Sequence, residues 1–218
     1  MKNILFIIIA FCIHFSLVKF GSLFTITFGV ASLIWPVPGV MLGLYFLYGH
    51  IILIGSMLSS LVSIYQLNSN SSFSIYLIII LSLVSVLQLV ISKQLVLRFI
   101  TLPLKTHIPN EMIKFLIFAG PLSAFVTSTI VMISRWVWLK IPTEVLYYIW
   151  AAKWVGDFIG IIFLTPVILF FRKNVYVRRA KHQTAAILTT LSVLGAISWI
   201  YILSSYNKQL EKSSNLLI

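Results

Sequence analysis

One carboxylate, Asp157, lies near the middle of an apolar run from Val145 to Phe171. The chain has only four acidic residues, and the other three lie at the edges of apolar segments or outside them. A charge at membrane depth costs at least ~2.5 kcal/mol on insertion scales, so an aspartate in such a run is a candidate functional residue. The chemistry open to it is recognition of a polar group, switching or proton transfer.

The residues around Asp157 form a stripe along one helix face. Lys153, Gly156, Asp157 and Gly160 occupy positions i, i+3, i+4 and i+7, and Trp150 extends the stripe by one turn. Lys153 and Asp157 can pair on the same helix, which lowers the cost of burying both charges. The two glycines allow a neighbouring backbone to approach closely. The stripe is therefore predicted to face the interior of a helical bundle rather than lipid.

Three roles for this stripe stay open. Lys153 and Asp157 can be a neutralised packing pair, a pair that contacts a ligand or switches, or part of a proton or ion relay. A relay usually needs several ionisable groups in series, whereas this segment offers one carboxylate and no obvious His or Glu partner. Packing and recognition are therefore the two stronger hypotheses.

A second constellation interrupts an earlier apolar stretch, and it consists of Trp35, Pro36, Val37, Pro38 and Gly39. Proline removes a backbone donor and disfavours helix at the preceding residue. Interrupted backbone at membrane depth is tolerated only where it is buried in protein or lines a cavity, and broken helices build binding sites in membrane proteins. The segment predicts either a turn between two short helices or a broken helix beside a pocket.

Composition sets the class of protein. The 218 residues are 60% hydrophobic and only 9% charged, whereas soluble domains have about 45–50% apolar and 25% charged residues. The net charge of +12 comes mostly from short basic loops, a pattern that indicates membrane topology rather than nucleic-acid binding. The fold class predicted is an all-α, polytopic transmembrane helical bundle with a broken helix near Trp35–Gly39.

About seven spans are predicted, within a range of six to eight. Their ranges are Asn3–Val18, Leu23–Tyr48, Ile51–Tyr65, Ser74–Leu97, Met112–Ile133, Val145–Phe171 and Thr184–Ser204. The basic loops place residues 98–114 and 172–181 in the cytoplasm, and the uncharged loop 68–72 outside. Seven spans then put Met1 inside and the tail outside. One domain, 1–205, and a polar tail or the start of a downstream segment, 206–218, are expected.

An alternative division gives six spans. In it, residues 22–34 form a re-entrant helix, Gly39–Tyr65 is one long span, and Met1 lies outside. Pro121 predicts a kink in the span Met112–Ile133, and the run from Ser134 to Trp138 predicts an interfacial anchor with aromatic residues. Gln88 requires hydrogen-bond partners if it is buried. No spacing of Cys or His predicts a metal site, and no cofactor is expected.

The two motifs together resemble a known family. The segment from Trp35 to Gly39 is similar to the W-P-P-x-G segment of the bacterial membrane-associated sensor domain, type 1, of the MASE group; here Val37 stands at the second proline position and the proline follows at Pro38. The segment from Trp154 to Pro166 resembles the family's W-x-G-D-x-x-G-x-x-x-x-x-P pattern. The order and separation of the motifs also fit, and the resemblance covers about residues 20–205.

The resemblance implies a sensory function. Such domains are input modules of histidine kinases and of enzymes that make or degrade cyclic-di-GMP, so the chain is expected in the bacterial inner membrane as a non-enzymatic module. Expected partners are the lipid bilayer, a cytoplasmic output domain in the same or another chain, a second copy, and a small-molecule ligand. No nucleic acid is expected. The residues predicted to form the pocket or its hinge are Trp35, Pro36, Pro38, Gly39, Trp150, Lys153, Trp154, Gly156, Asp157, Gly160 and Pro166.

Two other function classes fit parts of the sequence. A small-molecule transporter, or the membrane subunit that binds a transporter's substrate, has a comparable size, number of spans and basic loops. An intramembrane enzyme is less consistent with the sequence, because one Asp and one Lys form no recognisable set of nucleophile and base.

Overall fold

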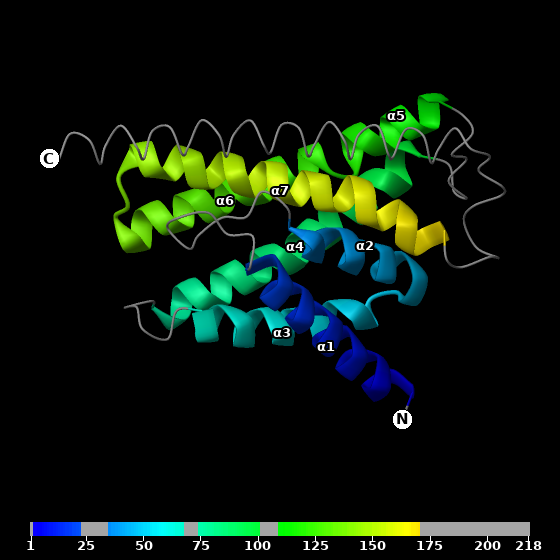
Figure 1. Ribbon diagram of the computed structural model, residues 1–218, viewed down its shortest axis with the longest axis horizontal. Coiled ribbons are helices and arrows are strands. Elements are labelled where there is room, and N and C mark those ends of the chain that lie inside the picture. The colour runs from blue at the N-terminus through cyan, green and yellow to red at the C-terminus, as the bar shows by residue number, and fades with distance from the viewer. Residues whose placement is uncertain (1, 23–34, 68–73, 101–108, 171–218) are drawn as a thin grey trace, which may run out of the picture. The chain divides into compact units, whose positions relative to one another are not determined.

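The computed structural model describes residues 2–22, 35–67, 74–100 and 109–170. The chain divides into the units Met1–Arg178 and Arg179–Ile218, and all described residues belong to the first. Seven helices and no strand occur in these ranges (Figure 1). They are α1 (Lys2–Ser22), α2 (Pro36–Tyr48), α3 (Ile51–Leu67), α4 (Ile75–Phe99), α5 (Pro109–Phe118), α6 (Pro121–Leu139) and α7 (Thr143–Phe170). The predicted helical bundle is confirmed, whereas the predicted span Thr184–Ser204 and the boundary at 205 lie outside the described residues.

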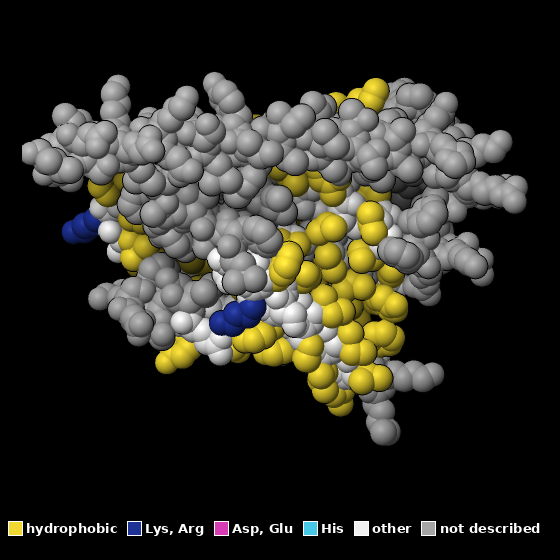
Figure 2. Space-filling model, in the orientation of Figure 1, with side chains coloured by type: hydrophobic (Ala, Val, Ile, Leu, Met, Phe, Trp, Pro, Cys, Tyr) yellow, Lys and Arg dark blue, Asp and Glu magenta, His cyan; other side chains and the backbone are white. Residues whose placement is uncertain are grey.

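Four of the described helices, α1, α4, α6 and α7, are long and apolar enough to cross a membrane, and α2 and α3 are shorter apolar helices. Many large apolar side chains remain exposed, among them Leu83 on α4 and Phe125 on α6. Figure 2 shows that apolar side chains dominate the described surface on one face of the molecule. Water disfavours so much exposed apolar surface, whereas lipid matches it. The chain is an integral membrane protein.

Helix α2 begins at the predicted break. Trp35 has an extended backbone, with φ −112° and ψ 99°, and Pro36 is the first helical residue. The first N–H groups of a helix have no partner within it, and Pro36 and Pro38 remove two of these donors because proline has no N–H. The helix can therefore start among buried residues with fewer donors to satisfy. The rest of the predicted span, residues 23–34, lies outside the described residues.

A tight turn at Gly49 and His50 separates α2 from α3. Gly49 has φ +75°, a conformation that L side chains rarely adopt, and its N–H donates to the carbonyl oxygen of Tyr45 at 3.1 Å. The chain reverses direction here (Figure 1). The alternative prediction of one continuous span from Gly39 to Tyr65 is therefore wrong.

The predicted span Met112–Ile133 is two helices rather than one. Helix α5 ends at Phe118, and α6 begins at Pro121 after a turn at Ala119 and Gly120. A proline inside a helix lacks the N–H for the carbonyl one turn earlier and its ring clashes with that carbonyl. Pro121 at the first helical position avoids both costs. The predicted kink is thus a helix boundary.

Helices α4 and α6 are antiparallel neighbours. The Ser92 hydroxyl donates to Ser123 Oγ at 2.7 Å, and Val84 and Val131 belong to one buried apolar cluster. Val84 precedes Ser92 on α4 whereas Val131 follows Ser123 on α6, so the helices run in opposite directions. The start of α4, the end of α6 and the start of α7 therefore share one end of the bundle.

Exposed aromatic side chains mark this end. They are Tyr76 on α4, Trp136 and Trp138 on α6, and Tyr147 and Tyr148 on α7. Trp and Tyr are enriched at membrane–water interfaces, so we call this the aromatic end and assign it to an interface. The tryptophans of the predicted anchor fit that assignment, but two guanidinium nitrogens of Arg135 are buried.

Candidate functional site

The two sequence motifs meet in space. The N–H of Trp35 donates to the carbonyl oxygen of Gly156 at 3.3 Å, and the Thr165 hydroxyl donates to the carbonyl oxygen of Gly39 at 2.9 Å. The start of α2 therefore lies beside the middle of α7, with one polar contact on each side of Gly160. Such backbone contacts need no long side chain, which is why small residues dominate the junction. We call this contact the α2–α7 junction.

Gly39 and Gly160 make the close approach possible. A Cβ atom on Gly39 would overlap the carbonyl group of Gly160, and a Cβ atom on Gly160 would overlap the carbonyl oxygen of Trp35. In both cases the obstacle is backbone, which cannot rotate away as a side chain can. The prediction that a neighbouring backbone approaches this glycine stripe agrees with the geometry, and the neighbour is the other motif.

Asp157 lies next to this junction and is buried, with 1% of its surface exposed. It is the central residue of the 25-residue candidate span Val145–Leu169. Lys153 Nζ donates to Asp157 Oδ2 at 2.5 Å, and Lys153 keeps 25% of its side-chain surface exposed. The pair lies within one helix, so this contact does not tie α7 to another helix. One charge is thus enclosed while its partner reaches the surface.

The start of α2 supplies a favourable field at the same depth. The N-terminus of a helix carries about half a positive elementary charge, and Trp35, just before α2, bonds to Gly156, the neighbour of Asp157. The direction of α2 is the one that favours negative charge near its start, and Asp157 follows the residue that accepts from Trp35. The position of α2 and the electrostatics of Asp157 are therefore coupled.

The two tryptophans of α7 face a different neighbour. The rings of Trp150 and Trp154 stack with centroids 5.6 Å apart, and each meets Phe125 of α6 edge-on. Trp150 Nε1 donates to Thr129 Oγ1 at 3.1 Å, and Trp154 Nε1 donates to the carbonyl oxygen of Pro121 at 3.0 Å. These bonds attach α7 to α6. Trp35 instead lies at the α2–α7 junction.

The predicted prolines also lie at this junction or near it. Pro36 and Pro38 are buried in the first turn of α2, and the Cα of Pro36 lies near Gly160. Pro166 is buried inside α7, directly after Thr165. A proline within a helix leaves one carbonyl without its helical donor and favours a local bend. The bend that Pro166 favours lies at the level where Thr165 bonds to α2.

Two residues of the junction were not predicted. Gly43 packs against Ile168, where a Cβ atom would meet the Ile168 side chain, and Thr165 donates to Gly39. The spacing Gly39-x-x-x-Gly43 is a small-residue packing pattern that could have indicated Gly43. A threonine in an apolar helix gives no comparable signal.

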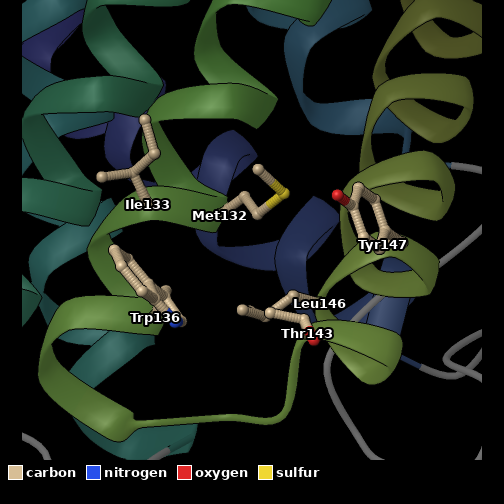
Figure 3. Close-up of a pocket in the computed structure, with 6 residues that line it drawn as sticks. All are labelled: Met132, Ile133, Trp136, Thr143, Leu146 and Tyr147. Carbon is tan, nitrogen blue, oxygen red and sulfur yellow. The ribbon is translucent and has the colours of Figure 1, made fainter.

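A small apolar cavity occurs elsewhere, between α6 and α7 at the aromatic end, with a volume of about 100 Å³. Its lining comprises Met132, Ile133, Trp136, Thr143, Leu146 and Tyr147 (Figure 3). None of these belongs to the predicted site. Within the described residues, no group of three His, Cys, Asp or Glu side chains is arranged to hold a metal ion.

Comparison with known proteins identifies the family. No curated protein and no solved structure matches the chain. The family model MASE1 matches residues 5–208, which is most of the chain. That range includes both motifs, every described helix except the first residues of α1, and the whole α2–α7 junction. The chain therefore belongs to the MASE1 family of membrane-associated sensor input domains.

Proposed function

We propose that this membrane protein is a sensory input domain that detects a ligand, a change in the membrane or a partner protein by altering the α2–α7 junction. The altered junction passes the signal to a cytoplasmic output domain, a kinase or cyclase in the same or a partner chain. The observation that carries the proposal is the backbone contact of the two glycine motifs beside Asp157. The family match supports the sensory class.

The junction has the properties of a two-position switch. Gly39 and Gly160 are in close contact, and such contacts are lost in steps because packed interfaces are discrete rather than continuously deformable. The two interhelical polar contacts, from Trp35 and from Thr165, are single hydrogen bonds, each worth about 0.5–1.5 kcal/mol. A stimulus of moderate strength can therefore compete with them.

The ion pair gives the switch a polar recognition group. Lys153 is partly exposed, so a ligand or a partner can reach its ammonium group and compete with Asp157. When the ion pair between Lys153 and Asp157 is lost, only the start of α2 is left to stabilise the buried carboxylate. Binding at Lys153 would therefore change the position of α2 that is most favourable. A ligand shifts such an equilibrium only by its differential affinity for the two packings.

The direction of transmission follows from α7. Its C-terminal end, at Phe170, lies away from the aromatic end, and the basic residues 172–181 that follow are expected in the cytoplasm. A shift of α7 against α2 therefore displaces the segment nearest to that side. In a homodimer, the two copies of the segment that follows α7 would act on a pair of output domains.

A fusion experiment tests this proposal. A diguanylate cyclase domain is fused before Met1, the terminus that seven spans place in the cytoplasm, and cyclic-di-GMP is measured in cells for the parent, Asp157→Asn, Gly160→Leu and Val167→Leu. We expect a change of output of about fivefold or more for the first two variants, which is a shift of about 1 kcal/mol between two states. Val167→Leu adds bulk at an exposed position of the same helix and should leave output unchanged.

Membrane abundance of each fusion is measured by immunoblot, so that loss of protein is separated from loss of signalling. Parental output from both Asp157→Asn and Gly160→Leu at normal abundance would remove the junction as the switch. Substrate uptake into proteoliposomes that is lost in Asp157→Asn would instead identify a transporter.

A further inference from the structure

Buried polar atoms on four side chains have no hydrogen-bond partner in the described part of the chain. The side chains are Ser63 on α3, Gln88 on α4, and Ser128 and Arg135 on α6. Helix α4 packs against both α3 and α6, so all four belong to one group of neighbouring helices. Buried polar groups are normally hydrogen-bonded, and none of these four belongs to the α2–α7 junction.

Gln88 and Ser128 lie at the same level of the bundle. The antiparallel pairing of α4 and α6 is fixed by the Ser92–Ser123 hydrogen bond and by the cluster that contains Val84 and Val131. Gln88 is midway between Ser92 and Val84, and Thr127, followed by Ser128, is midway between Ser123 and Val131. Gln88 is 3% exposed and Ser128 is fully buried, yet Gln88 Nε2 and Ser128 Oγ have no partner among the described residues.

Arg135 approaches the same place from the aromatic end. It follows Ser128 by seven residues, which is two helical turns, so the two share a face of α6. Long side chains on a helix lean toward its N-terminus, which directs the guanidinium group toward Ser128. Its Nε and Nη1 atoms are buried and make no hydrogen bond within the described ranges.

We propose that Arg135, Gln88 and Ser128 form an anion-binding site inside the bundle that accepts a carboxylate or phosphate group. The unpartnered nitrogens are all donors, two of them on a permanent cation, and Ser128 adds a hydroxyl that can donate. Oxyanions are the natural partner of such a set, because charge-assisted hydrogen bonds to guanidinium are about twice as strong as neutral ones. The carboxylate of Asp157 is already bonded to Lys153.

The position of the site gives anions a route to it. Arg135 lies near the end of α6, which ends at Leu139, and the exposed Lys140 follows at the interface. A cation there attracts anions from water or from lipid headgroups. The same chemistry therefore fits a soluble acid or phosphate and the phosphate of an anionic lipid.

A binding experiment on the purified full chain tests the site. The midpoint of thermal unfolding is measured in neutral detergent against sodium phosphate and sodium acetate, with sodium chloride holding the ionic strength constant. A second arm compares nanodiscs of phosphatidylcholine with nanodiscs that also contain phosphatidylglycerol. We expect a saturable rise of about 5–10 °C at one hundred times the dissociation constant in at least one arm. Soluble ligands and headgroups are distinguished by which arm responds.

The variants are chosen to separate binding from folding. Arg135→Met removes the charge while keeping a long side chain, Gln88→Leu removes the amide, and Lys140→Asn removes an exposed cation at the same end. We expect Arg135→Met and Gln88→Leu to weaken binding at least tenfold, and Lys140→Asn to change it less than threefold. In chloride alone, Arg135→Met should be at least as stable as the parent, because it removes two buried guanidinium nitrogens that have no partner among the described residues.

Arg135→Met is thus expected to be as stable as the parent in chloride but less stable than the parent when the oxyanion is present. A purely structural arginine would not give this result, because it would stabilise the protein equally with and without the oxyanion. The proposal fails if neither arm gives a saturable response in the parent. It fails equally if Arg135→Met and Gln88→Leu respond like the parent. It does not depend on the α2–α7 junction, since Asp157→Asn should retain the response.

Discussion

At the scale of single residues, three cations within the described helices are accommodated in different ways. Lys153 neutralises Asp157. Lys93 has no carboxylate partner in the described part of the chain; its Nζ donates to the carbonyl oxygen of Tyr45 at 3.2 Å and lies 3.8 Å from the centroid of the Tyr45 ring. It therefore combines a helix C-terminus with a cation–π contact, two interactions that favour positive charge. Arg135 has neither.

The ion pair predicts an asymmetric mutational response. Lys153→Met leaves the buried Asp157 without its partner and should cost about 3 kcal/mol of unfolding free energy. Asp157→Asn leaves Lys153, which is partly exposed and can turn toward the surface, and should cost about 1–2 kcal/mol. The combined change Lys153→Met with Asp157→Leu should lie close to the parent. Unfolding by SDS titration in mixed micelles measures all three, and equal losses in the two single variants would contradict the assignment.

At the scale of the helix, the α2–α7 junction is a contact between backbones. Gly39 and Gly160 lie in helices, where alanine is intrinsically more favourable than glycine by about 1 kcal/mol. The close approach of the two helices explains why glycine stands at both positions, since any larger residue would place its Cβ atom against a carbonyl group. At both positions glycine lowers the helix propensity but allows α2 and α7 to come into backbone contact.

Gly160→Ala should therefore destabilise the protein by about 2 kcal/mol, even though alanine favours the helix itself. Gly39→Ala should have a similar effect. The double variant should cost less than the sum, because the first methyl group already separates the helices and the second meets a widened gap. Ala152→Gly, on α7 outside the junction, reports the propensity term alone and should cost about 1 kcal/mol. Additive effects of the two junction glycines would show that they act at separate contacts.

The sequence predicts part of this arrangement well. Apolar runs locate α1, α3, α4 and α7, the prolines locate the start of α2, and the helical period places Asp157 and Gly160 on one stripe. The sequence cannot show that the stripe of Asp157 and Gly160 contacts the motif from Trp35 to Gly39. Hydropathy indicates which segments lie in the membrane, but not how each helix is rotated or which helix it packs against. Arg135 illustrates the limit: its neighbouring tryptophans favour an interfacial anchor, and only the structure shows that two of its guanidinium nitrogens are buried.

At the scale of the whole molecule, the antiparallel helices define two membrane faces. Tyr76 and Tyr148 are exposed and lie at the aromatic end, whereas Arg98 is exposed near the end of α4 and belongs to the opposite face. The basic loops predict that the face of Arg98 is cytoplasmic. Helix packing determines which residues share a membrane face, whereas the distribution of basic residues predicts which face is cytoplasmic.

Cysteine labelling tests both. Cys12, the chain's single cysteine, is exposed on α1 and is first replaced in Cys12→Ala. Tyr76→Cys and Tyr148→Cys should then react with a membrane-impermeant maleimide on intact cells, and Arg98→Cys should react only after permeabilisation. Opposite accessibility of Tyr76→Cys and Tyr148→Cys would contradict the helix pairing, and a reversed pattern for all three would contradict only the orientation.

The placement of Lys153 and Asp157 on one helix has a consequence for biosynthesis. An ion pair between two helices can form only after both have entered the membrane and found each other. A pair at i and i+4 forms as soon as the segment coils, so α7 can leave the translocon already neutral. The carboxylate of Asp157 is thus shielded before tertiary structure exists, and insertion of α7 does not have to wait for α2.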